Sequence, residues 1–241
     1  MKTAAVVIAM AAAILGSACA NVSPLPAGGG PPSVAAPDIR IGDRWTFEER
    51  NGYNQERTGS LQQEVVATTG PQLRVSVNNN GKSTTEAYTR DWNWLSKNLK
   101  IAPGEQRFDF KTAFPAYMFP LQPDQGWFID VAASNAGGRS VPFKVRTKVL
   151  GWQRIRVPAG DFDALLIRRE VWMGDEDMFR TGTEIVEYDW YAPKVNNVVR
   201  HEENSKYYSK TSTNGHLSAA VIRGDWRIYE LTAYDNRGGG Q

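Results

Sequence analysis

A strict alternation of apolar and charged residues is the feature of this sequence that most constrains its fold. Over residues 143–149 the two alternating sets are Phe143, Val145, Thr147 and Val149, and Lys144, Arg146 and Lys148. A repeat of two residues is typical of a β-strand that buries one face. The same alternation recurs over residues 73–77, 154–157 and 186–190. The sequence therefore predicts an all-β fold of antiparallel strands.

Turn sequences separate these segments into consecutive hairpins. Gly, Pro, Asn and Asp gather where one strand should end and the next begin. The predicted turns are at residues 51–52, 69–71, 78–81, 135–138, 158–160, 214–215 and 223–225. The pattern after the first 20 residues predicts no amphipathic helix of ordinary length. We expect a single curved antiparallel meander sheet over residues 39–235, shaped as a half-barrel or incomplete barrel.

The two ends of the chain are expected to lie outside this domain. Residues 1–20 place Lys2 before an apolar run and small residues, which is the pattern of a secretory signal peptide. Residues 21–38 are rich in Pro and Gly and predict a linker. Residues 236–241 are rich in Gly and predict a disordered tail.

Cys19, the single cysteine of the chain, lies where the signal peptide ends. The stretch from Gly16 to Cys19 resembles the lipobox of bacterial lipoproteins, although Leu15 lies one place further upstream than in that motif. The alternative is cleavage after Ala20, which leaves a soluble periplasmic protein that starts at Asn21. We favour lipidation because a tether follows the cysteine. Since Ala20 is not the Asp that retains lipoproteins in the inner membrane, the resemblance implies a Gram-negative outer-membrane lipoprotein facing the periplasm.

The net charge gives no indication of a nucleic-acid partner. The chain has 28 Lys and Arg against 26 Asp and Glu, and removal of Lys2 with the signal peptide leaves 27 basic residues. A nearly balanced charge lacks the basic excess typical of nucleic-acid binding. The predicted partner is instead a membrane, reached through the lipid anchor.

Aromatic residues crowd a proline-interrupted segment between residues 98 and 127. The prolines argue against a central strand there, and the segment should either plug one end of the sheet or line a hydrophobic opening. Trp92 and Trp94 are two residues apart and share one face. The candidate ligand-binding residues are Trp92, Trp94, Phe114, Tyr117, Met118 and Phe119. The tryptophans predicted to be core are Trp45, Trp127, Trp152 and Trp190.

Basic residues gather on two neighbouring predicted strands. Together they would form a cationic strip of Lys144, Arg146, Lys148, Arg154 and Arg156. Such a strip would suit contact with anionic lipid headgroups, lipopolysaccharide or peptidoglycan. The alternative, which we favour, is the solvated face of a sheet whose other face is core.

The sequence carries no pattern of metal or nucleophilic chemistry. His201 and His216 lack the spacing of a zinc site, and we interpret His201 as a polar residue at a strand end. Glu184 and Glu187 should point to opposite faces of one strand, unlike the paired carboxylates of a glycosidase. The glycine runs lack the Lys of a phosphate loop, and no Gly-x-Ser-x-Gly motif is present. The chain is therefore predicted to be non-enzymatic, without metal or cofactor.

Two motifs resemble a known family. The first is W-x-x-I-x-V-P-A-G-x-F-x-A over residues 152–164, and the second is W-Y-x-P-x-V-x-x-V over residues 190–198. Both are similar to motifs in a family of proteobacterial exported β-rich envelope proteins, often lipoproteins, with no agreed activity. In outline that family is similar to the half-barrel of lipoprotein-carrier proteins. Asn196 stands where the second motif has Gly, and Asn tolerates the left-handed conformation of a tight turn.

Three functions remain open. The leading hypothesis is binding or carriage of an apolar or amphipathic envelope molecule in a concave, aromatic-lined groove. The second is a structural or assembly role, in which the cationic strip or a sheet edge docks a partner protein or the cell wall. The third is a hydrolase acting on an envelope polymer, retained because carboxylates are plentiful.

Overall fold

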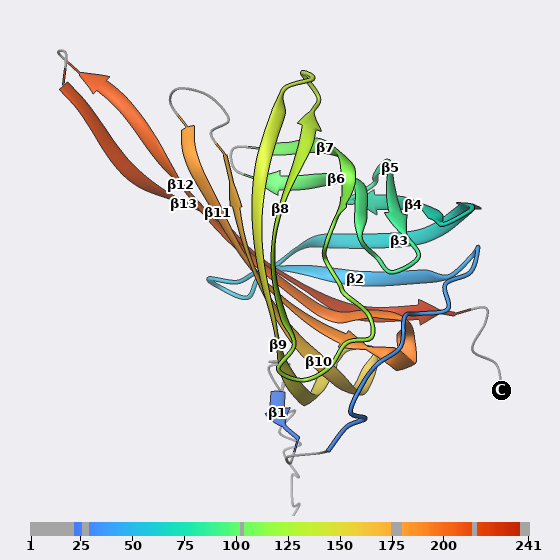
Figure 1. Ribbon diagram of the computed structural model, residues 1–241. Helices are drawn as coiled ribbons and strands as arrows, with labels where there is room; N and C mark the ends of the chain where they lie inside the picture. The colour runs from blue at the N-terminus through green and yellow to red at the C-terminus, as the bar shows by residue number, and fades with distance from the viewer. Residues whose placement is uncertain (1–21, 26–28, 102–103, 175–179, 214–215, 237–241) are drawn as a thin grey trace, which may run out of the picture.

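The computed structural model describes residues 22–25, 29–101, 104–174, 180–213 and 216–236 (Figure 1). The predicted signal peptide, Cys19 and the tail beyond Asn236 lie outside these residues. The elements in chain order are β1 (Val22–Pro24), β2 (Arg44–Asn51), β3 (Arg57–Thr69), β4 (Gln72–Asn79), β5 (Lys82–Thr89), β6 (Trp94–Ile101), β7 (Gly104–Phe114), β8 (Gly126–Asn135), β9 (Ser140–Val157), β10 (Gly160–Met173), β11 (Arg180–Ala192), the 3-10 turn η1 (Pro193–Val195), β12 (Asn197–Thr213) and β13 (His216–Asp235).

The strands form a closed antiparallel barrel. From β2 to β13 each strand pairs with the next one along the chain, as the meander prediction requires. The last strand then pairs with the first, because β13 bonds to β2 along Arg227–Asp235 and Arg44–Asn51. This pairing closes a ring of 12 strands, to which β1 adds at the edge of β9. The all-β antiparallel prediction is confirmed, whereas the predicted half-barrel or incomplete barrel is wrong.

The closure escaped prediction because turn chemistry specifies only which strands follow each other. The two strands that close the barrel stand at opposite ends of the folded chain, and their pairing depends on the curvature accumulated over all the hairpins between them. The register of this junction shifts between Leu231 and Ala233, where Thr232 Oγ1 donates to the carbonyl of Thr46 at 3.0 Å. Such a bulge increases local twist and bends a strand toward closure.

The strand β9 confirms the alternation that led the sequence analysis. Its burial pattern places Phe143, Val145 and Val149 in the core, while the lysines and arginines between them are exposed. Among the described residues, four predicted turns contain a glycine with positive φ, namely Gly70 (57°), Gly81 (86°), Gly138 (76°) and Gly160 (130°). An L side chain rarely adopts this conformation, so glycine at these turns fixes the hairpins.

One predicted turn is wrong. Residues 223–225 do not end a strand, because β13 continues through them as far as Asp235. Gly224 instead lies beside a register shift between Asn204 and Lys206 of β12. A Cβ at Gly224 would approach Ser205 Oγ to 2.2 Å, so glycine permits close contact between the two strands.

The predicted linker is not free of the barrel along its whole length. Val34 is 5% exposed and exchanges backbone hydrogen bonds of 2.8 and 2.9 Å with Leu121. Trp152 Nε1 donates to the Pro31 carbonyl at 3.0 Å. This stretch therefore packs on β9 and on the loop between β7 and β8, while the domain boundaries stay predictions. No helix among the described residues combines the length and hydropathy of a membrane span.

Candidate functional site

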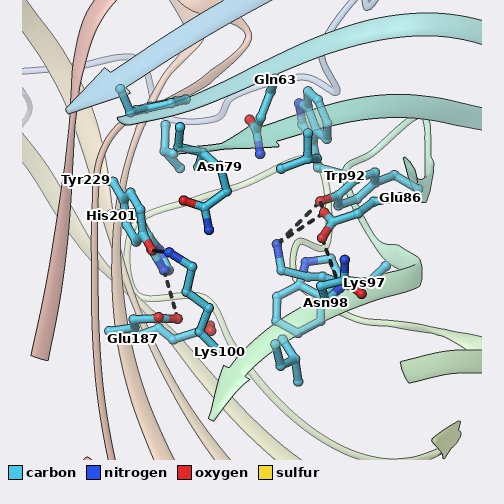
Figure 2. Close-up of a pocket in the computed structure, with 18 of the residues that line it drawn as sticks. Gln63, Asn79, Glu86, Trp92, Lys97, Asn98, Lys100, Glu187, His201 and Tyr229 are labelled. Carbon is cyan, nitrogen blue, oxygen red and sulfur yellow. Dashed lines mark hydrogen bonds and ion pairs between the residues drawn. The ribbon is translucent and has the colours of Figure 1, made fainter. Parts of the chain in front are cut away.

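A cavity of about 140 Å³ lies in the lumen of the barrel. One wall comes from β2 to β6 and the turn between β5 and β6, and the other from β10 to β13 (Figure 2). In Figure 2 the side chain of Asn79 from β4 and those of Lys97 and Lys100 from β6 point into the same space. The lumen of the barrel therefore contains a pocket with both aromatic and charged walls.

The aromatic wall is organised by Trp92. This residue has a positive φ of 59° in the turn between β5 and β6, which suits a tight connection of the two strands. Its ring packs edge-on against Trp45 at 5.4 Å and Tyr88 at 5.2 Å between centroids. Its Nε1 donates to the carbonyl of Asn196 at 2.8 Å, just after η1. Asn196 adopts the predicted left-handed conformation, with φ of 55°.

The predicted ligand-binding residues divide between the pocket and its support. Trp92, Trp94 and Tyr117 line the cavity. Phe114 is fully buried and stacks on Trp94 at 3.9 Å, so it supports the wall from behind. Phe119 packs against Tyr117 and Tyr191, and Met118 is 42% exposed. The three residues Phe108, Phe110 and Phe114 lie on β7, so the expectation of no central strand before Pro115 is wrong.

The opposite wall contains buried charges that the sequence analysis did not identify. Arg169 of β10 is 2% exposed, and Glu187 and Asp189 of β11 are each 3% exposed. The guanidinium donates to Glu187, to Asp189 at 3.0 Å and to the carbonyl of Ala116 at 2.8 Å. Burial lowers the pKa of Arg169, but the charges of the two carboxylates outweigh it and raise the pKa above its ordinary value. Arg169 thus stays charged inside the barrel.

Tyr117 connects the aromatic and charged walls. Its hydroxyl donates to Asp189 Oδ2 at 2.8 Å. Burial and the neighbouring Asp189 raise the pKa of Tyr117 well above its usual range, so it remains a donor. Burial also opposes ionisation of Asp189, but Arg169 holds the pKa of that carboxyl well below its usual range.

His201 lies inside the barrel, in the middle of this network. Its Nδ1 is 2.6 Å from Asp189 Oδ1, and its Nε2 is 3.7 Å from Glu203 Oε2. Burial lowers the pKa of His201, but the charge of Asp189 and the hydrogen bond to it raise that pKa to about 10. The imidazole therefore carries a proton at neutral pH. The interpretation of His201 as a strand-end residue is wrong, because β12 extends from Asn197 to Thr213.

Glu187, His201 and Glu203 offer ligand atoms within 4.8 Å of one another, a spacing that a metal ion could use. The ligand atoms of these three residues already have partners within the protein. Glu187 accepts from Arg169, Glu203 accepts from Arg227 at 2.7 Å, and His201 holds its proton. A metal would have to displace that proton and lie close to two guanidinium groups. The donor set therefore fits an internal ion-pair network better than a metal centre.

Two of the three lysines that line the pocket, Lys97 and Lys100, differ in how fully they are bonded. Lys100 Nζ makes three short contacts, to Glu49 Oε1 at 3.1 Å, Glu49 Oε2 at 3.0 Å and the Tyr229 hydroxyl at 3.0 Å. Lys97 Nζ has one hydrogen bond of 3.4 Å, to the Tyr88 hydroxyl, and a 4.0 Å ion pair with Glu86. An ammonium has three N–H donors, so Lys97 keeps bonding capacity that Lys100 has used.

The comparisons with known proteins give the chain no family. No family model matches it, and no curated protein matches it. A similar solved structure is that of a Bacteroides fragilis protein described as exported and as having a YmcC-like fold. The two chains share 12% identity, the match covers 84% of this chain and 99% of that one, and the TM-score is 0.47. A likeness of this size carries no argument about function, and the proteobacterial resemblance stays a prediction.

The predicted cationic strip lies on the outside of the barrel, with its charges largely paired. Arg154 and Arg156 form two-bond ion pairs with Asp163 and Asp161 across the β9–β10 hairpin. Arg146 is 3.8 Å from Glu170. Lys148 Nζ bonds to the carbonyl of Asp124, and Lys144 is exposed. The five residues share a solvated surface, as the favoured alternative proposes, and contact with an anionic surface stays a prediction.

The sequence could have predicted that these charged residues lie together inside the barrel only if the strand register had been known. Arg169 lies opposite Glu187, Glu187 opposite Glu203, and Asp189 opposite His201. All three are direct cross-strand pairs. The first and the third join opposite charges, an arrangement that stabilises a sheet, whereas Glu187 and Glu203 are alike in charge and are compensated by Arg169 and Arg227. In sequence these residues are 18, 16 and 12 positions apart, and nothing local indicates which face of the sheet they occupy.

Proposed function

We propose that this chain is a non-enzymatic binding protein of the bacterial envelope, which holds a small amphipathic molecule in the lumen of its barrel. The observation that carries the proposal is the pocket in the barrel lumen, in which buried polar atoms are left unpaired. Asn79 Oδ1 and Arg169 Nε are buried pocket atoms without a hydrogen-bond partner among the described residues. Buried polar groups normally have partners, and binding pockets combine aromatic walls with a few such groups.

The size of the cavity limits the ligand. An engineered protein cavity of about 150 Å³ accommodates benzene. The lumen of about 140 Å³ can therefore enclose a group of that size, while a longer molecule would have to extend out of the barrel. This favours recognition of a ring-sized group over carriage of a whole lipid. Because the pocket lies in the barrel lumen, we propose binding there in place of the concave groove expected from the sequence.

The predicted export signal and lipid anchor support an envelope location. The lipoprotein assignment rests on Cys19, which follows a signal-like segment and precedes a Pro/Gly-rich stretch. Attachment of Cys19 to a membrane is part of the proposal, as is the outer-membrane position. A soluble periplasmic protein that starts at Asn21 would have the same pocket and the same binding function.

Native mass spectrometry of protein extracted gently from its own envelope tests this function. We expect a discrete non-covalent adduct of small-molecule mass, and the covalent mass would also show whether Cys19 is lipidated. Leu61→Trp should abolish the adduct, because Leu61 lines the pocket on β3 and a larger ring there fills it. Val66→Trp is the matched control, since Val66 of the same strand is 46% exposed. Protein without an adduct, or equal retention by both variants, would contradict binding in the lumen.

A further inference from the structure

The charged side chains of this pocket are not equally available to a ligand. The carboxylates of the pocket already accept hydrogen bonds from donors of the protein. Glu86 accepts from the Tyr88 hydroxyl and, at 2.9 Å, from the backbone N–H of Asn98. Glu187 and Asp189 both accept from Arg169. A ligand therefore finds few free acceptors among the charged groups of this lumen.

On the donor side, Lys97 keeps free N–H groups, whereas Lys82, another lysine of the lining, is 73% exposed and pairs with Glu105 at 3.7 Å. The side chain of Lys97 is 24% exposed, and it lies on the β6 wall with its ammonium directed into the cavity (Figure 2). The 3.4 Å hydrogen bond to Tyr88 and the 4.0 Å approach to Glu86 are both long. The rings of Trp94 and Tyr88, at 4.9 and 5.6 Å from Nζ, attract the cation but accept few of its N–H groups.

The aromatic faces argue against a cationic ligand. Rings that recognise ammonium ligands need an open face toward the cation. Here the protein's own cations already occupy such faces, because Arg169 lies 5.8 Å from the Trp94 ring and 5.4 Å from the Tyr117 ring. Lys100 lies 5.4 Å from the ring of Tyr229. A second cation over any of these three rings would meet a like charge of the protein.

We infer that the ligand of this pocket is a small organic anion, a carboxylate or phosphate on an apolar group about the size of a benzene ring, whose anionic oxygens bind Lys97. The inference rests on the proposed function, since it names the class of molecule that the same pocket takes. The anion supplies the acceptors that Lys97 lacks, and the apolar group lies against apolar side chains of the lining such as Leu61 and Leu99. A charge-assisted hydrogen bond in a partly buried site is stronger than a neutral one.

Calorimetric titration with three probes tests the inference. Benzoate and benzamide have nearly the same shape but differ in charge, and phenyl phosphate carries the alternative anionic group. We expect benzoate or phenyl phosphate to bind about 10- to 100-fold more tightly than benzamide. Whichever anion binds better identifies the source of the charge, carboxylate or phosphate. Equal binding of benzamide and both anions would overturn the inference.

Variants of Lys97 test whether the anion binds at this residue. Lys97→Met keeps the length of the side chain and removes its charge, so it should reduce anion affinity to the level of benzamide, and Lys97→Arg should restore most of it. Lys111→Met, at an exposed position on β7, should leave the affinity unchanged. Unchanged anion affinity in folded Lys97→Met would overturn the inference. A neutral native adduct without anion binding would also overturn it while the proposed function stands, and the loss of adduct and probe binding together would overturn both.

Discussion

Replacement of Arg169 by Met is expected to destabilise the protein by about 3–5 kcal/mol, the usual cost of removing one partner of a buried ion pair. The guanidinium is 2% exposed and is shared by Glu187 and Asp189, which are also buried. Without it, Glu187 loses its hydrogen-bonded cation, and Asp189 keeps His201 and Tyr117 as partners among the described residues. The free energy of unfolding in urea, followed by tryptophan fluorescence, measures the loss.

Two further variants show whether the loss comes from uncompensated charge. Arg168→Met, at the neighbouring position of β10, removes an arginine whose side chain is 40% exposed and pairs with Glu170. We expect a change of at most about 1 kcal/mol there, because exposed ion pairs contribute little. Arg169→Met combined with Glu187→Met should recover much of the stability, since Asp189 keeps His201 as its partner. A double variant as unstable as the single one would show that Arg169 acts through packing rather than charge.

The strands and hairpins could be predicted from the sequence because their signals are local. Alternation identified β9, and turn residues with positive φ, such as Gly70 and Gly81, marked hairpins at the correct places. The closure of the barrel could not be predicted this way. It depends on a register between β2 and β13, whose residues are far apart in the sequence and carry no paired pattern of their own.

Only part of the pocket could be predicted, because some of its residues are recognised without knowledge of the strand register and others are not. Trp92, Trp94 and Tyr117 were identified because exceptional aromatic content needs no register to be noticed. Glu187 and Asp189 alternate with Val186 and Tyr188, so the usual rule places the apolar set inside. The structure places the carboxylates inside, where Arg169 compensates them from the next strand. Local rules often fail where function or strain overrides them, which is consistent with the lumen as the functional site.

The stability of the protein is expected to fall as pH rises from about 6.5 toward 10, because of His201. Its pKa in the folded protein is about 10, against an ordinary value of 6.5. Between these values the folded state binds a proton that the unfolded state has lost, so each increase in pH favours unfolding. The contribution is complete below pH 6.5 and disappears above pH 10. One such proton gives a slope of at most about 1.4 kcal/mol per pH unit, and partial solvent screening reduces it.

Urea unfolding of the wild type and of His201→Gln at pH 7, 8 and 9 isolates this effect. The wild type should lose about 1–2 kcal/mol over the range, and the variant, which is less stable at pH 7, should lose much less. Glu203 does not interfere, since its pKa is lowered to about 2, and its contribution is lost only as pH falls from about 4.5 through that value. His216→Gln is the matched control, because residue 216 begins β13 opposite Thr213, outside the network around Asp189. Parallel pH profiles for the wild type and His201→Gln would mean that Asp189 is compensated without the proton on His201, and that Arg169 and Tyr117 are sufficient to hold its charge inside the barrel.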